Sequence, residues 1–141
     1  MDCQDDICNE THISLNIAFS GDIEVECPPD KNIVGQSGWA LLHTMAAHYP
    51  DKPSEECKKI HQKFIQSFSR VYPCKSCASH FRYMMKNQPP ELENREKLSI
   101  WMCNMHNEVN KMLMKPVFSC DMQSLDERWR KAEPPCNSFI D

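Results

Sequence analysis

The sequence is short of glycine, with three glycines among its 141 residues. Neither a G-x-G-x-x-G turn nor a P-loop can be drawn in it, so backbone cradles for phosphate are excluded. A bound phosphate would have to meet lysine or arginine side chains instead. Long apolar runs are lacking too: the longest, such as Trp39 to Leu42, hold about four residues, whereas a membrane span needs about 20. We therefore expect no membrane insertion.

Basic residues are missing from the start of the chain. The first 30 residues hold eight acidic residues and no lysine or arginine, which leaves residues 31–141 with a net charge of +4 (16 − 12). A nucleic-acid-binding protein would show a concentrated basic stripe, and a mitochondrial presequence would be rich in arginine and poor in acids. We therefore expect neither a nucleic-acid partner nor a cleaved mitochondrial presequence. We expect an acidic flexible arm over residues 1–30, followed by a single domain over residues 31–141.

Apolar residues at helical spacing, interrupted by prolines, predict an all-α fold. Ser54 with two acids behind it is a helix-start signal, and Pro73 can begin a helix without losing a needed N–H group. No pair of strands can be drawn, so we expect a four-helix bundle with one short additional helix. The expected helices cover residues 31 to about 49, 54 to about 72, 73 to about 88, about 93 to 114 and about 123 to 130.

Cysteine is abundant, with nine residues. The count is odd, so at least one thiol is free or pairs between chains. The sharpest local feature is Cys74-Lys75-Ser76-Cys77 at the start of the expected third helix. Unpaired N–H groups at a helix N-terminus stabilise a thiolate, and the three-residue spacing lets the two sulfurs form a disulfide. The motif favours redox chemistry and leaves metal binding open.

A zinc site is the alternative. Cys74, Cys77, Cys103 and His106 together give a Cys₃His set that tetrahedral zinc accepts, and the protein would then be a helical interaction module rather than an enzyme. Cys120 argues against this set, because a bond from Cys103 to Cys120 would clip the intervening segment onto the fourth helix and contribute about 3 kcal/mol by loop closure. If that disulfide forms, the zinc site is lost.

The expected fourth helix carries unusual polar residues. His106, Asn107 and Asn110 lie in its interior although asparagine is a mediocre helix former, and His106 and Asn110 are one turn apart. A solvated face with one buried histidine is the plain interpretation. A thioredoxin-like site is excluded, because its C-x-x-C motif needs a βαβ context that this sequence lacks. Aromatic and histidine side chains elsewhere in the chain favour a flat aromatic ligand, a flavin held inside a helical bundle. These side chains are Trp39, His43, Trp101 and Trp129.

Five ordered segments between Cys27 and Cys136 resemble the Erv/ALR family of FAD-dependent sulfhydryl oxidases. They are CPPD (27–30), GQSGWALLHTMAAHYPD (35–51), FIQSFSRVYPCKSCASHF (64–81), WMCNMHNEVNKMLMKPVFSC (101–120) and LDERWR (125–130). The resemblance implies a helical bundle that encloses FAD.

The resemblance also implies roles for four of the matched cysteines. Cys74 would exchange with the substrate, and Cys77 would be the thiol next to the flavin. Cys103 and Cys120 would form a structural disulfide.

The other five cysteines lie outside these two pairs. Cys27 and Cys136 match positions of an intersubunit disulfide pair, so we expect a head-to-tail covalent homodimer. Cys3 and Cys8 are spaced C-x₄-C rather than C-x-x-C and are a candidate shuttle pair, with unstructured bystander thiols as the alternative. Cys57 is expected to be the free cysteine, on the core side of the second helix.

Cofactor contacts follow from the resemblance as well. The pyrophosphate of FAD would be neutralised by Lys31, Lys111, Lys115 or Arg128, a choice that spacing leaves open. The sequence departs from the family pattern at Gln36, where arginine is usual, and at Gly38 and Met114, where serine and glycine are common. The implied FAD-site residues are Lys31, Gly35, Gln36, Gly38, Trp39, His43, Cys103, His106, Asn107, Val109, Asn110, Leu113, Lys115, Arg128 and Trp129.

The activity implied is the oxidation of protein dithiols to disulfides. Electrons would pass through the C-x-x-C pair and FAD to dioxygen, giving hydrogen peroxide, or to cytochrome c. The acidic arm could steer such a basic acceptor toward the enzyme. The expected substrate is a disulfide carrier of the mitochondrial intermembrane space, where the protein is expected to reside, with a cytosolic or virus-encoded member as the alternative.

Overall fold

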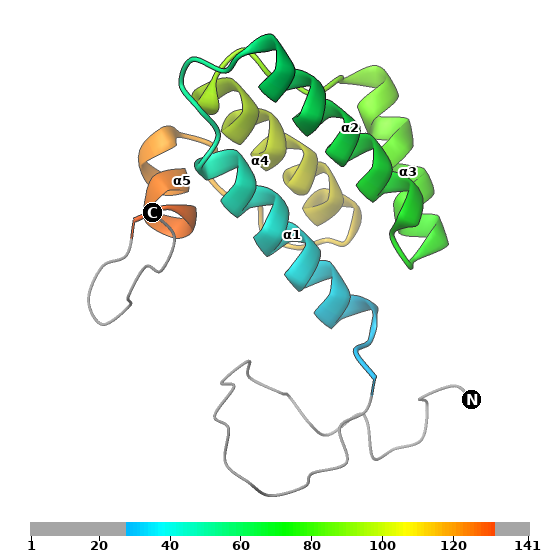
Figure 1. Ribbon diagram of the computed structural model, residues 1–141. Helices are drawn as coiled ribbons and strands as arrows, with labels where there is room; N and C mark the ends of the chain where they lie inside the picture. The colour runs from blue at the N-terminus through cyan, green and yellow to red at the C-terminus, as the bar shows by residue number, and fades with distance from the viewer. Residues whose placement is uncertain (1–27, 132–141) are drawn as a thin grey trace, which may run out of the picture.

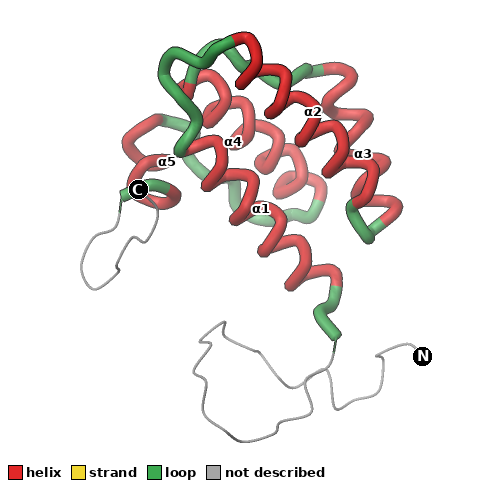
Figure 2. Tube along the Cα trace, in the orientation of Figure 1, coloured by secondary structure: helices red, strands yellow, loops and turns green. Residues whose placement is uncertain are grey.

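The computed structural model describes residues 28–131, which form five α-helices and no strand (Figures 1 and 2). Within this range no helix has the length and apolar character of a membrane span. The all-α prediction is confirmed. The helices are α1 (Lys31–Ala47), α2 (Glu55–Val71), α3 (Lys75–Asn87), α4 (Arg95–Met112) and α5 (Met122–Trp129).

The helices pack in pairs. Helix α1 lies along α4, and α2 lies along α3 (Figure 1). The short helix α5 packs against both α1 and α4 at one end of the bundle. The core between the helices is made of aliphatic, aromatic and methionine side chains: Leu42, Ala46, Tyr49, Ile65, Phe81, Met84, Leu98, Trp101, Met102 and Met105.

Each helix begins at a residue whose side chain accepts a hydrogen bond from the first turn. Asp30, Ser54, Asn94 and Asp121 use oxygen atoms, and Cys74 uses its sulfur. Such caps satisfy N–H groups that have no partner inside the helix. Helix α1 starts at residue 31, as expected, and the other four helices start one or two residues away from the expected positions because the capping residue sets each start.

Nearly all of the acidic arm expected over residues 1–30 lies outside the described residues. The same holds for the expected intersubunit pair Cys27 and Cys136 and for the candidate shuttle pair Cys3 and Cys8. Cys57 is the one cysteine within residues 28–131 without a disulfide, and it is half-buried on α2 against the core.

Helix α4 ends in a left-handed residue. Met114 has φ 54°. The N–H of Lys115 donates to the carbonyl of Asn110 at 2.8 Å, and that of Met114 donates to Lys111 at 3.1 Å. These two bonds form a Schellman motif, in which the left-handed position is usually glycine because a Cβ atom is disfavoured there. The departure from the family pattern at Met114 therefore places a strained residue at this turn.

Replacing Met114 with glycine is expected to raise the free energy of unfolding by about 0.5–1 kcal/mol. The left-handed conformation costs a non-glycine residue about 1–2 kcal/mol, and the greater conformational entropy that glycine loses on folding offsets part of this gain. Met114 is 94% exposed, so little packing is lost. Urea unfolding of the purified protein measures the change. The matched control is Met112→Gly, in the last turn of α4, which should lower stability. A loss of stability in both variants would contradict the assignment of strain.

Candidate active site

Two disulfides lie within residues 28–131. Cys74 pairs with Cys77, with Cα atoms 5.3 Å apart, and Cys103 pairs with Cys120, with Cα atoms 5.7 Å apart. The zinc alternative is therefore wrong, because Cys74, Cys77 and Cys103 all use their sulfurs in disulfides. No group of three or more metal-ligating side chains occurs in the described part of the chain.

The Cys74–Cys77 disulfide lies at the N-terminus of α3. The sulfur of Cys74 caps the helix, because the backbone N–H of Cys77 donates to it at 3.3 Å. A thiolate formed at Cys74 would keep this donor and the positive end of the helix dipole, and both stabilise it. Cys77 is exposed and Cys74 is half-buried. An external thiol can reach the disulfide.

Two histidines and two tryptophans form an interleaved cluster between α1, α4 and α5. The rings of Trp39 and His106 are stacked with centroids 4.2 Å apart, and those of His43 and Trp129 with centroids 4.5 Å apart. His43 Nε2 and His106 Nδ1 share a hydrogen bond of 2.9 Å. Four residues predicted from the sequence as cofactor contacts are thus brought together, and their parallel rings suit a flat aromatic ligand.

This cluster is connected to α3, the helix that begins at the Cys74–Cys77 disulfide. Phe81 of α3 meets the ring of Trp39 edge to face, with centroids 5.9 Å apart. Phe81 follows Cys77 by four residues, one helical turn, so both lie on nearly the same side of α3. Residue types alone did not mark Phe81 as part of the site. The disulfide is therefore one turn of α3 from a residue that contacts the cluster.

The electrostatics of the cluster keep both histidines neutral. Burial lowers the pKa of His43 to about 3, with further lowering from His106 and Arg128. Burial, Arg128 and Lys115 lower the pKa of His106 to about 4. At neutral pH the pair therefore holds one hydrogen bond between uncharged rings. The positive charge near it comes from Arg128 and Lys115.

These shifts predict a pH dependence of stability. The unfolded histidines titrate near the ordinary value of 6.5, whereas His43 and His106 stay neutral in the folded protein to about 3 and 4. Between these values the unfolded state binds more protons, so stability falls as the pH drops below 6.5, by at most about 1.4 kcal/mol per pH unit per histidine. Urea unfolding at pH 7, 6 and 5 measures it. A His43→Gln/His106→Gln variant with an unchanged slope would contradict the assignment.

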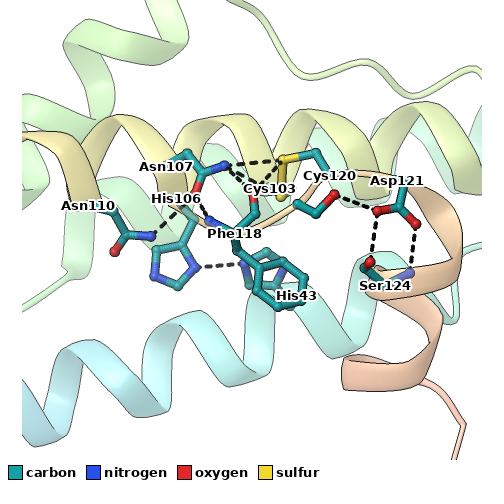
Figure 3. Close-up of a disulfide and its surroundings, with 10 residues drawn as sticks. His43, Cys103, His106, Asn107, Asn110, Phe118, Cys120, Asp121 and Ser124 are labelled. Carbon is teal, nitrogen blue, oxygen red and sulfur yellow. Dashed lines mark hydrogen bonds between the residues drawn. A yellow bond between two sulfur atoms is a disulfide. The ribbon is translucent and has the colours of Figure 1, made fainter. Parts of the chain in front are cut away.

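Asn107 holds the loop after α4. Its side-chain amide donates to the carbonyl of Phe118 at 2.8 Å, and its side-chain oxygen accepts from the N–H of Phe118 at 2.9 Å (Figure 3). Asn110 adds a bond of 3.3 Å to that same oxygen. The amide of Asn107 also contacts the Cys103–Cys120 sulfurs. The predicted site residue Asn107 thus positions Phe118.

Arg128 lies over two aromatic rings. Its guanidinium carbon is 5.4 Å from the ring centroid of Phe118 and 4.9 Å from that of Trp129. No ion-pair partner of Arg128 occurs among the described residues. The ring nitrogen of Trp129 is buried and has no hydrogen-bond partner in this part of the chain. A buried donor without a partner is costly, so the surroundings of Trp129 suit a ligand that supplies an acceptor.

Helix α5 is held in place by an ion-pair network that sequence reasoning missed. Arg95 of α4 donates to Asp126 of α5 at 2.6 Å and contacts Asp51 at 3.4 Å. Arg95 and Asp126 are largely buried, with side chains 16% and 14% exposed. Because α5 carries Arg128 and Trp129, this network positions one wall of the cluster. The 31-residue separation gives no local signal of the contact.

Several predicted site residues are not part of the aromatic cluster. Lys31 is twelve residues before His43 on α1, about 18 Å along the helix axis. Gly35 and Gly38 instead adjoin the ring of Tyr72, at the end of α2. Lys111 is paired with Glu108 at 2.7 Å. The other predicted positions are Gln36 and Leu113, both exposed, and Val109, half-buried against the core.

The fold and these contacts define a helical bundle with an accessible disulfide at the start of α3 and a cluster of aromatic and histidine rings beside Arg128 and Lys115. The Erv1 / Alr family model matches residues 36–130. The chain belongs to this family, and the resemblance found in the sequence is confirmed.

Relatives and solved structures agree with this assignment. The mitochondrial FAD-linked sulfhydryl oxidase ERV1 of Saccharomyces cerevisiae is 43% identical over 103 residues, which cover 73% of this chain and 53% of the relative. The FAD-linked sulfhydryl oxidase ERV1 of Arabidopsis thaliana is 41% identical, over 75% of this chain and 54% of the relative. The chain thus spans about half the length of these curated relatives. The crystal structure of the yeast Erv1 core matches with a TM-score of 0.73 at 39% identity, over 82% of this chain and 96% of that one.

Proposed function

We propose that this protein is an FAD-linked thiol oxidase that converts protein dithiols to disulfides. The observation that carries the proposal is the accessible Cys74–Cys77 disulfide, one helical turn from Phe81, which contacts the aromatic cluster. Membership of a family whose relatives are named FAD-linked sulfhydryl oxidases supports it. The acceptor would be dioxygen, yielding hydrogen peroxide, or cytochrome c.

The residues present fit FAD. The ligand has two flat ring systems and a pyrophosphate, and the cluster offers parallel aromatic and neutral histidine rings with Arg128 and Lys115 beside them. The unpartnered ring nitrogen of Trp129 is a donor for an acceptor on the ligand. His43, His106 and Trp129 would therefore hold the rings, and the two cations would meet the phosphates. FAD, when bound, would supply a two-electron acceptor for the reduced cysteine pair.

The chemistry of the disulfide follows from the cap at Cys74. A substrate thiolate attacks the sulfur of Cys74, forms a mixed disulfide and releases Cys77 as a thiolate. The second substrate thiol then attacks the substrate sulfur, which forms the substrate disulfide and releases Cys74. The N–H of Cys77 favours this last step because it stabilises the departing Cys74 thiolate. Two electrons are then on the cysteine pair, and Cys77 would be the thiol next to a bound flavin.

The substrate class is a protein dithiol, and we propose a disulfide carrier of the mitochondrial intermembrane space. The name of the yeast relative places that protein in mitochondria. Cys3 and Cys8 are proposed as a shuttle pair between such a substrate and Cys74.

A homodimer is proposed as the assembly. Helices α1 and α2 carry large apolar side chains that are at least half exposed: Leu41 at 50% and Ile60 at 56%. Contiguous exposed apolar surface marks protein interfaces, and Leu41 and Ile60 would belong to such a surface in the dimer. Cys27 and Cys136 would add intersubunit disulfides. Sedimentation with and without reductant would measure both contributions.

A visible absorption spectrum tests the proposed activity. The purified protein should show bound flavin that bleaches on addition of excess dithiol and recovers as oxygen is consumed. A protein that is colourless and takes up no FAD on refolding would overturn the proposal. Hydrogen peroxide formed per thiol pair consumed gives the stoichiometry, and repeating the assay with cytochrome c compares the two acceptors.

A further inference from the structure

The outer surface of α2 and α3 carries a cluster of exposed cations. Lys59, Lys63 and Arg70 are separated by four and seven residues, so they share one face of α2. Lys75, Arg82 and Lys86 share one face of α3 in the same way. All six are exposed. We call this set the basic face.

The two halves of the basic face adjoin each other. Helices α2 and α3 lie side by side (Figure 1). The guanidinium of Arg82 donates to the backbone carbonyl of Ser69, the residue before Arg70. Lys75 directly follows Cys74, so the basic face reaches the redox disulfide. A partner bound to it would lie next to that disulfide.

The charge of the basic face is not balanced nearby. Residues 57–90 contain seven lysines and arginines and no aspartate or glutamate. The seventh cation, Lys58, bonds to Glu55 and Glu93 and is not part of the face. No member of the face has an ion-pair partner among the described residues. Like charges this close favour the binding of an acidic polypeptide.

The chain itself contains such a polypeptide. Residues 1–30 hold eight acidic residues and no lysine or arginine. Asp30 caps α1, so the other seven are left for binding. They join α1 close to the basic face, because Gly35 and Gly38 of α1 adjoin Tyr72, two residues before Cys74. A stretch of 20 residues can span up to about 70 Å, whereas α3 is about 20 Å long. Residues 1–30 can therefore reach every cation of the face.

We propose that the basic face binds the acidic segment of residues 1–30. Joining the two parts in one chain raises the effective concentration of the segment to about the millimolar range, so weak ion pairs suffice. The bound segment would lie beside the Cys74–Cys77 disulfide. The proposal rests on the charges and the fold, not on the proposed oxidase activity.

Carbodiimide cross-linking of the full chain tests the proposal, because it joins carboxylates to lysines that lie in contact. At low salt, mass spectrometry should find residues 1–30 linked to Lys59, Lys63, Lys75 and Lys86 at least threefold more often than to the exposed control lysines Lys52 and Lys97. Sodium chloride at about 0.5 M should suppress these links, since it reduces the screening length to a few Å. Links spread evenly over all exposed lysines, or links insensitive to salt, would overturn the proposal.

A charge reversal provides the matched variant. Arg70→Glu places a negative charge within the basic face and should reduce links at Lys63 and Lys75 at least threefold. Lys97→Glu on α4 changes the net charge equally and should leave them unchanged. An equal decrease in both variants would show that only net charge matters and would refute a binding face. Far-UV circular dichroism confirms that both variants keep the helical fold.

Discussion

Replacing Cys77 with serine is expected to lower kcat for dithiol oxidation about 1,000-fold or more, with flavin binding retained. Without Cys77 no disulfide can form with Cys74, so electrons from a substrate have no acceptor within the chain. The exposed side chain of Cys77 contributes little to packing, and serine is close to it in size. Oxygen consumption measures kcat, and the visible spectrum reports the bound flavin.

Cys57→Ser is the matched control, because Cys57 has no disulfide in the described part of the chain. It should keep kcat within about twofold. The proposed roles also predict different trapped species. Cys77→Ser should accumulate a mixed disulfide between Cys74 and an added substrate disulfide, whereas Cys74→Ser should not trap substrate at Cys77. A Cys77→Ser enzyme with more than a tenth of normal kcat would contradict the mechanism.

The helices could be predicted from the sequence because their limits are local. Apolar residues at helical spacing indicate which segments are helical. Ser54, as a cap, and Pro73 and Pro116, as breaks, indicate where those segments begin and end. The same is true of the Cys74–Cys77 motif, whose spacing and position at a helix start are local features. Helix α4 ends at Met112, two residues before the expected end, because Leu113 and Met114 form the Schellman turn.

Contacts between distant residues could be predicted only in part. Residue types favoured an aromatic site, but the pairing of Trp39 with His106 and of His43 with Trp129 depends on how α1, α4 and α5 pack. The role of Asn107 is another example. Its residue type suited a ligand contact, yet its amide binds both backbone groups of Phe118, a partner eleven residues away.

Replacing Cys120 with serine is expected to lower the free energy of unfolding by about 3 kcal/mol. The Cys103–Cys120 disulfide closes a loop with a sequence separation of 17, and opening it restores the chain entropy of the unfolded state. For a domain of this size the loss corresponds to a fall in Tm of about 10 °C or more. Urea unfolding and thermal melts measure it, with Cys57→Ser as the control.

Cys120→Ser should also weaken FAD binding several-fold, because Cys120 precedes Asp121, the cap of α5, and α5 carries Arg128 and Trp129. The Arg95–Asp126 ion pair remains in this variant, so α5 should still form but with a less fixed position. A Cys103→Ala/Cys120→Ala variant removes the buried free thiol that Cys120→Ser leaves at Cys103, and it should show the same loss of stability if the cause is loop closure. A loss below about 0.5 kcal/mol in both variants would show that the hydrogen bonds of Asn107 to Phe118 hold this loop without the disulfide.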